Sequence, residues 1–299
     1  MSRRVLITGA TGFAGVHLVA ACESAGDDVV AAPPSSALDL RDPAAARRLL
    51  AGARPDVIYH LAARAHVGQS WDDPIGTLCD NVAMSAALLE AVRTEAPEAV
   101  VLSVGSGEEY GPPETVPTTE AHPLRPQNPY AVSKASSGLL ARFHADAHGL
   151  RVIHARAFNH AGPGQEPIYA IANFARQFAE GLEAGDDPIT IVTGSPDTRR
   201  DFTDVRDVVR AYRMLAEYGE PGVFNVCSGV SRSARELLAA LGEVAGVAVD
   251  HQVDPAKVRA HEVFEVRGSH DALHAATGWT PAIPLQTTLA DTLAFWRER

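Results

Sequence analysis

The chain has 299 residues, of which 46% are hydrophobic and 21% are charged. These values are close to the globular average, so they exclude a disordered, collagen-like or coiled-coil protein. The 26 Lys and Arg residues against 37 Asp and Glu residues give a net charge of −11. Because an acidic chain is a poor general binder of nucleic acids and anionic membranes, we expect neither as a partner.

The three cysteines, Cys22, Cys79 and Cys227, show no CxxC spacing and are few for this length. We therefore predict no disulfide framework and no metal site, which fits a reducing cytoplasm. The first apolar stretch ends at Gly9 and is therefore too short to be a signal peptide or a membrane span. No other window approaches the ~18 apolar residues of a span.

The first half of the chain alternates short apolar runs with helical patterns. Strands are predicted at 5–8, 29–32, 57–61, 99–104 and 151–156, and helices from the first glycine-rich loop to about residue 25 and at 43–51, 81–94 and 129–148. This βαβα order indicates a parallel sheet with helices on both faces. The strands lack polar alternation, as expected when both faces of a sheet are buried.

After residue 159 the alternation weakens. Helices are predicted at 171–181, 204–218, 233–245, 271–277 and 284–299, and strands at 189–192 and 223–226. The predicted fold class is α/β, with a Rossmann-type doubly wound parallel sheet and a smaller, mixed α/β C-terminal substrate lobe. The division is residues 1–160 for the dinucleotide-binding domain, with 201–228 returning to it, and 161–299 for the substrate lobe.

A glycine-rich loop joins the first strand to the first helix. Gly9, Gly12 and Gly15 allow a tight turn whose backbone N–H groups reach a pyrophosphate at the helix N-terminus. The spacing is GxxGxxG, and the alternative is a plain turn after a strand. At the end of the second strand, residues 32–36 carry neither a carboxylate for a ribose nor a cation for a 2′-phosphate. The choice between NAD and NADP therefore stays open.

A tyrosine and a lysine four residues apart begin the helix at 129–148. Asn128 is a suitable N-cap, so Tyr130 and Lys134 share one helix face. A free tyrosine has a pKa near ~10, and a neighbouring ammonium is expected to lower it, which makes a tuned proton donor. The serine-rich segment 103–111 after the fourth strand offers a hydroxyl beside Tyr130. The alternative is a pair of ordinary surface residues.

These features together resemble the extended short-chain dehydrogenases/reductases that act on nucleotide-activated sugars. Within that superfamily the chain resembles the group of GDP-mannose 4,6-dehydratases and GDP-6-deoxy-mannose reductases. The resemblance rests on the glycine loop, Ser106, the Tyr130–Lys134 pair and the segments 158–165, 200–207, 225–229 and 277–281. It covers nearly the whole chain, and the later segments are more specific than the glycine loop.

The resemblance implies a role for each matching residue. It implies catalysis by Tyr130 as the acid/base, Lys134 as its partner and ribose contact, and Ser106 as the anchor of a sugar oxygen, with Glu108 as an open candidate for a C5 base. Implied cofactor contacts, to NADP(H) or NAD(H), are Gly9, Thr11, Gly12, Phe13, Ala14, Gly15, Asp39, Leu40, Leu61, Ala62, Ala63, Tyr130, Lys134 and His160. For Asp39 the alternative is an ion pair with Arg41.

The resemblance also implies which residues hold a GDP-linked sugar substrate. These are Asn159, Arg200, Arg259 and Glu262. Guanidinium groups suit a diphosphate in an otherwise acidic protein. The alternative for each arginine is ordinary surface charge, and Glu262 pairs either with a guanine edge or with Arg259.

The expected activity is reduction at C4 of a GDP-linked 4-keto-6-deoxy-hexose by NAD(P)H. The alternatives are a GDP-mannose 4,6-dehydratase, another sugar-nucleotide 4-epimerase or dehydratase, and a dinucleotide-binding regulator without catalysis. Ser106-Gly107-Glu108 lacks the hydroxyl pair usual in the dehydratases, which favours the reductase. We also expect a homodimer through the helices at 81–94 and 129–148, with contacts from Met84, Ala87, Leu88, Ala91, Leu139, Leu140 and Phe143.

Overall fold

The computed structural model describes residues 2–258 and 263–299 and is built around a six-stranded parallel sheet. The strand order is β2–β1–β3–β4–β5–β9. The bounds are β1 Arg4–Thr8, β2 Asp28–Ala31, β3 Val57–His60, β4 Val100–Ser106, β5 Arg151–Ala157 and β9 Gly222–Val226. All neighbouring pairs are parallel. The predicted doubly wound α/β sheet is confirmed.

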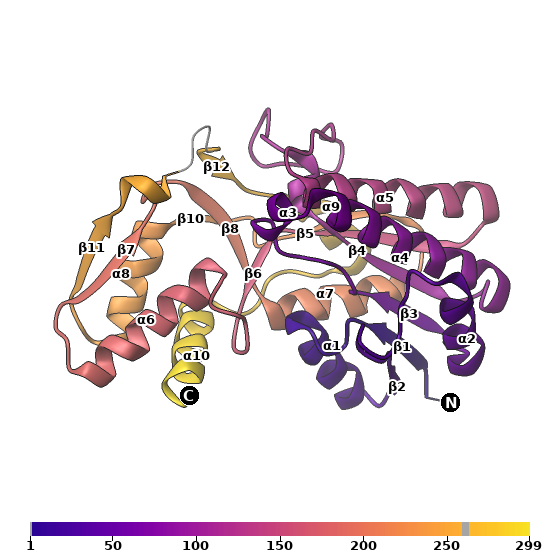
Figure 1. Ribbon diagram of the computed structural model, residues 1–299, viewed down its shortest axis with the longest axis horizontal. Coiled ribbons are helices and arrows are strands. Elements are labelled where there is room, and N and C mark those ends of the chain that lie inside the picture. Colours follow the sequence, from indigo (N-terminus) through magenta and orange to yellow (C-terminus); the bar gives the residue numbers. More distant parts are fainter. Residues whose placement is uncertain (1, 259–262) are drawn as a thin grey trace.

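Helices cover both faces of this sheet, which explains why its strands are apolar throughout (Figure 1). One face packs against α1 Phe13–Ser24, α7 Val205–Tyr218 and α9 Asp271–Thr277. The other packs against α2 Pro43–Ala53, α4 Pro74–Glu95 and α5 Pro129–His148. Residues 205–226 come late in the chain, yet they add helix α7 and strand β9 to the lobe that is built around the six-stranded sheet.

Helix α4 begins seven residues earlier than the predicted start at residue 81. Asp73 caps it, because its side chain accepts a hydrogen bond from the Gly76 N–H, and Pro74 occupies the first helical position. A short helix, α3 Gln69–Asp72, precedes it. By length and composition α4 is apolar enough to cross a membrane, contrary to the prediction. Its residues Leu88 and Val92 are instead fully buried against the sheet and α2.

A second core lies in the other lobe, drawn on the left of Figure 1. It joins the helices α6 Ala170–Ala184, α8 Ala234–Ala245 and α10 Leu285–Arg297 to the strand pair β7 Ile189–Thr193 and β11 Val249–Val253. Between the lobes lies a small sheet of β10 Ser231–Ser233, β8 Arg199–Asp204 and β12 Glu265–Val266, with β6 Asn159–Ala161 paired to β8. The division of the chain at residue 160 stays a prediction.

Two buried carboxylates, those of Asp201 and Asp207, hold the segment 201–207 in place through hydrogen bonds from backbone N–H groups. Asp201 accepts hydrogen bonds from the backbone N–H groups of Ser228, Gly229 and Gly268, at 2.8, 3.0 and 3.2 Å. Asp207 accepts from the N–H groups of Ala282 and Ile283, both at 2.8 Å. These bonds fix the loop after β9 and the approach to α10 against the centre of the molecule.

Candidate active site

The glycine loop follows β1 at the carboxyl edge of the sheet, where ligands bind in open α/β folds. Gly9 has a φ of +71°, and a Cβ there would lie 2.8 Å from the Ala62 nitrogen. The Gly12 N–H donates to the Gly9 carbonyl at 3.0 Å, and Gly12 is the N-cap residue of α1. A Cβ on Gly15 would overlap the Gly9 carbonyl oxygen. Only glycine fits at both tight positions, so the sequence pattern has a structural cause.

A series of hydrogen bonds joins the end of β1, just before the glycine loop, to the end of the neighbouring strand β3. The Thr8 hydroxyl lies 2.8 Å from His60 Nδ1 and accepts from the Ala62 N–H at 3.3 Å. Burial and the nearby Lys134 charge lower the pKa of His60 to about 3, so the imidazole is neutral at pH 7. These hydrogen bonds hold the segment that contains Leu61, Ala62 and Ala63 beside the glycine loop, where the resemblance places cofactor contacts.

The predicted catalytic side chains meet where β4 ends and α5 begins. Ser106, Tyr130 and Lys134 are all buried, with exposed fractions of 7%, 9% and 6%. Asn128 caps α5 by accepting from the Ala131 N–H at 2.8 Å, and Pro129 follows it. The Lys134 ammonium donates to the Val104 carbonyl at 2.7 Å and lies 6.0 Å from the centre of the Tyr130 ring.

The pKa of Tyr130 differs from the prediction made from its spacing to Lys134. Burial raises this pKa above its ordinary value, and a hydrogen bond with Ser106 opposes the rise. The ammonium of Lys134 donates to the Val104 carbonyl and does not offset the hydration that the Tyr130 hydroxyl loses on burial. Burial also lowers the pKa of Lys134 to about 8. Tyr130 is therefore set to hold its proton at neutral pH, as a donor must.

Glu108 and Glu109 are adjacent in sequence and have opposite environments. Glu108 is exposed, and its carboxylate accepts from the Asn128 amide at 3.0 Å. Glu109 is fully buried in the 3₁₀ helix η1 Gly107–Tyr110. It accepts from the Ser106 backbone N–H at 2.8 Å and so fixes the strand end that carries the Ser106 hydroxyl.

The Glu109 carboxylate is also the centre of a buried ionic network that the sequence analysis missed. His154 Nε2 lies 2.8 Å from one of its oxygens, and Arg156 Nε donates to the other at 2.8 Å. Arg156 also donates to the Tyr110 hydroxyl at 3.0 Å. The signal in the sequence was two ionisable residues, His154 and Arg156, at alternate positions in the part of the strand that follows Arg151 and is otherwise apolar.

The predicted cofactor contacts beyond the glycine loop fall in two places. His160 stacks on Phe13 with ring centres 5.9 Å apart, beside the start of α1. Leu40 is buried. Asp39 is exposed and pairs with Arg41 through hydrogen bonds of 2.9 and 2.8 Å, which is the alternative considered for it. Arg41 in turn reaches Asp80 at 2.7 Å.

Of the predicted substrate residues, two are described. Asn159 is exposed at the start of β6. Arg200 lies on the neighbouring strand β8, and its guanidinium donates to the carbonyls of Arg199 and Val263 at 2.9 and 3.0 Å. Arg259 and Glu262 lie outside the described residues. Strands β6 and β8 are paired, so Asn159 and Arg200 lie on the same small sheet between the lobes.

Comparisons with known proteins agree with this architecture. The profile of the NAD dependent epimerase/dehydratase family matches residues 5–227. GDP-6-deoxy-D-mannose reductase of Pseudomonas aeruginosa is 38% identical, over 100% of this chain and 99% of its own. UDP-glucose 4-epimerase of Mycolicibacterium smegmatis is 31% identical over 99% of each chain. A solved structure of RMD from Pseudomonas aeruginosa with NADPH superposes with a TM-score of 0.91, at 36% identity over 99% of each chain.

The fold and the buried Ser106, Tyr130 and Lys134 define an NAD(P)-dependent oxidoreductase of the short-chain dehydrogenase/reductase type. The chain belongs to the NAD dependent epimerase/dehydratase family.

Proposed function

We propose that the protein reduces a GDP-linked 4-keto-6-deoxy-hexose at C4, with NADPH or NADH as the reductant. The observation that carries the proposal is the complete, buried Ser106, Tyr130 and Lys134 set in a chain 38% identical, from end to end, to a GDP-6-deoxy-D-mannose reductase. The intact set also argues against a regulator that binds a dinucleotide without catalysis.

The residues at the glycine loop fit a dinucleotide. No acidic side chain occupies the first turn of α1, and the glycines let the loop turn tightly against its own backbone, so that the positive end of α1 is available to a diphosphate. Thr11, Phe13, Ala14 and His160 are proposed as further contacts. When bound, the nicotinamide cofactor supplies the hydride for reduction of the ketone.

We assign the proton transfer to Tyr130. Its raised pKa keeps the phenol protonated at neutral pH, ready to donate to the sugar O4 as that oxygen gains charge. The Ser106 hydroxyl is proposed to bind the same oxygen, in a position fixed by Glu109. Lys134 is proposed to orient a ribose, and its ammonium lies 6.0 Å from the centre of the Tyr130 ring.

The test of the proposed function is a direct assay. The purified protein is incubated with GDP-4-keto-6-deoxy-mannose and either NADPH or NADH, and loss of nicotinamide absorbance is followed. Equimolar oxidation of the cofactor and formation of the C4 alcohol support the proposal. No oxidation with either cofactor would overturn it. The two cofactor arms also decide between NADP and NAD, which the segment 32–36 leaves open.

The dehydratase is the second candidate, because Glu108 stands where a C5 base would act. The structure gives Glu108 a different partner, the amide of Asn128 that caps α5. We expect Glu108→Gln to lower the reductase rate only a few-fold, about 1 kcal/mol or less of barrier. The measurement is the steady-state reductase rate, together with incubation of the wild type with GDP-mannose and oxidised cofactor. Formation of a 4-keto-6-deoxy product there, and its loss in Glu108→Gln, would favour the dehydratase.

We also propose a homodimer through α4 and α5, in a cytoplasmic enzyme. Leu139 and Phe143 are 63% and 53% exposed on α5, as an interface requires. Ala87, Leu88 and Ala91 are buried within the chain and cannot contribute, which corrects their predicted role. At the N-terminal ends of these helices an apolar groove of about 430 Å³ extends the same face.

All three cysteines are free, in keeping with a reducing compartment.

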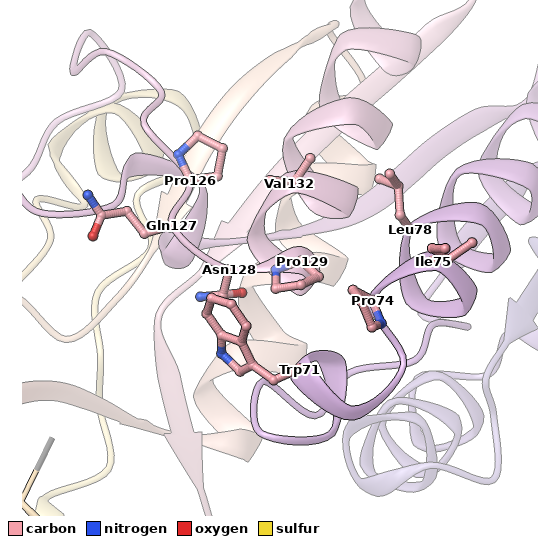
Figure 2. A pocket seen from close by; sticks show the side chains of 9 residues that line it. All are labelled: Trp71, Pro74, Ile75, Leu78, Pro126, Gln127, Asn128, Pro129 and Val132. Atoms are coloured by element: carbon pink, nitrogen blue, oxygen red, sulfur yellow. The ribbon is translucent and has the colours of Figure 1, made fainter. Parts of the chain in front are cut away.

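Figure 2 shows this groove, with Trp71, Ile75 and Leu78 from the α3–α4 segment facing Pro129 and Val132 of α5. Trp71 is 63% exposed. Burying Trp71 against a second chain would remove its exposed apolar area from water.

We expect sedimentation at two concentrations to show a dimer, and the variant Leu139→Glu to sediment as a monomer. In the dimer, the glutamate introduced at Leu139 would be buried in the apolar face of α5 without a partner for its charge. The exposed Val253→Glu is the matched control, because Val253 lies on β11 in the other lobe. A wild type that stays monomeric at all concentrations would refute the proposed dimer.

A further inference from the structure

The seam between α4 and α5 carries a row of polar contacts that begins beside Tyr130 and Lys134 and leads away from them. The Asn81 amide donates to the Ser133 hydroxyl at 2.8 Å. One turn further along, the Ser85 hydroxyl donates to that of Ser137 at 2.9 Å. Both contacts are buried and complete, so the two helices are joined by side-chain hydrogen bonds over their first half.

The row ends differently near the C-terminal ends of the two helices. There Glu90 faces His144 and His148, and one potential ligand atom from each lies within 4.8 Å of the other two. His144 is only 3% exposed, and its Nδ1 has no hydrogen-bond partner in the described parts of the chain. Its Nε2 lies 3.9 Å from Glu90 Oε1, too far for a hydrogen bond. The nitrogen that faces the carboxylate is therefore Nε2, and at this distance it is not engaged in a hydrogen bond with Glu90.

The geometry of the three side chains suits a cation. His148 lies one helical turn after His144 on the same face, with ring centres 5.3 Å apart. Arg93 binds only Oε2 of Glu90, at 3.0 Å, which leaves Oε1 directed toward His144.

We propose that Glu90, His144 and His148 bind a Zn²⁺ ion at this seam. Two imidazoles and a carboxylate form a ligand set that zinc uses in proteins, with a fourth position for water. Tetrahedral bonds of about 2.0–2.1 Å place ligand atoms about 3.4 Å apart. The atoms of the cluster, which lie within 4.8 Å of one another, would have to move together by up to about 1.4 Å to bind the ion. The sequence analysis predicted no metal site from the small number and the spacing of the cysteines, and it did not bring together a carboxylate and two histidines that are far apart in the chain.

The ion would join α4 to α5 where the row of hydrogen bonds stops. Because the ligands come together only in the folded chain, bound Zn²⁺ would stabilise that state in proportion to its occupancy. The site is independent of the proposed reductase activity and lies on a different part of α5 from Tyr130.

The test is a calorimetric titration of tag-free, chelator-treated protein with Zn²⁺, repeated with Mg²⁺. We expect one Zn²⁺ per chain, no saturable Mg²⁺ binding, and a melting temperature that rises with Zn²⁺ concentration. His148→Ala removes an exposed side chain, so the fold stays intact, and its sedimentation is compared with that of the wild type because His148 contacts Phe143. Loss of a single outer partner of a metal ligand typically weakens binding about 10–100-fold, and loss of a ligand should cost at least as much.

Two control variants separate this site from other zinc ligands. Glu95→Gln removes an exposed carboxylate of the same helix that is not in the cluster, and Cys79→Ser removes the exposed thiol. Both should bind like the wild type, whereas Glu90→Gln should weaken binding as His148→Ala does. Wild-type affinity in His148→Ala, loss of binding in Cys79→Ser, or no saturable binding by the wild type would each overturn the proposal.

Discussion

Tyr130→Phe is expected to lower turnover on the order of 10²–10⁴-fold, the usual contribution of a positioned general acid. The substitution removes one hydroxyl and keeps the ring, which is 9% exposed, so packing around the start of α5 changes little. The lost group is the one whose raised pKa keeps it protonated at neutral pH and which hydrogen-bonds with Ser106.

The measurement is the steady-state rate with saturating cofactor, together with circular dichroism and cofactor titration to verify fold and binding. Tyr59→Phe is the matched control. Its ring is fully buried, and its hydroxyl has no hydrogen-bond partner within the described structure. Removing that hydroxyl breaks no bond, so the control should keep its rate. Turnover near the wild-type value in Tyr130→Phe would exclude Tyr130 as the proton donor.

The parts of this protein that the sequence predicted well are those where local chemistry determines structure. Helix α5 has the predicted bounds, because Asn128 caps its start and Gly149, with a φ of +67°, ends it. The glycine loop is similar, since Gly9 and Gly15 are required by close backbone contacts. Tyr130 and Lys134 follow from the same helix start, so their place on one face of α5 could be predicted from their spacing, and their catalytic role stays a prediction.

The parts that sequence reasoning missed depend on contacts between distant segments. Strand β8 has the sequence RRDFTD, whose polar residues give no strand signal, and it forms by pairing with β6, β10 and β12. Trp71 is exposed although its residue type suggests burial. The direction of the Tyr130 pKa shift also depends on burial, which the spacing to Lys134 does not reveal.

The second large effect is expected at Glu109, which the sequence analysis did not single out. Glu109→Gln removes the only charge that the Arg156 guanidinium and the His154 ring share in the described structure. Arg156 is left with its side chain 8% exposed and without a counter-charge. Breaking a buried ion pair in this way costs about 3–5 kcal/mol of stability. The measurement is the free energy of unfolding from urea titration at 25 °C and pH 7.

Glu108→Gln is the matched control for this change, because it alters the neighbouring and exposed glutamate. Surface substitutions of this kind usually change stability by less than about 0.5 kcal/mol. If both variants lose equal stability, the Glu109 network is not what holds the end of β4. The reductase rate adds a second readout, since a displaced Ser106 should lower turnover even under conditions where the variant is folded.

The pH dependence of the difference between wild type and Glu109→Gln tests the cause. Burial alone would raise the pKa of Glu109, but the charges and hydrogen bonds of His154, Arg156 and Ser106 together lower it to about 2. An unfolded glutamate has a pKa near ~4.3, so the charge stabilises the fold fully above that pH and progressively less as pH falls toward 2. The difference in unfolding free energy should therefore be constant from pH 7 to about 5 and shrink below about 4. A difference that stays constant down to pH 3 would mean that lost packing, and not the charge of Glu109, destabilises the variant.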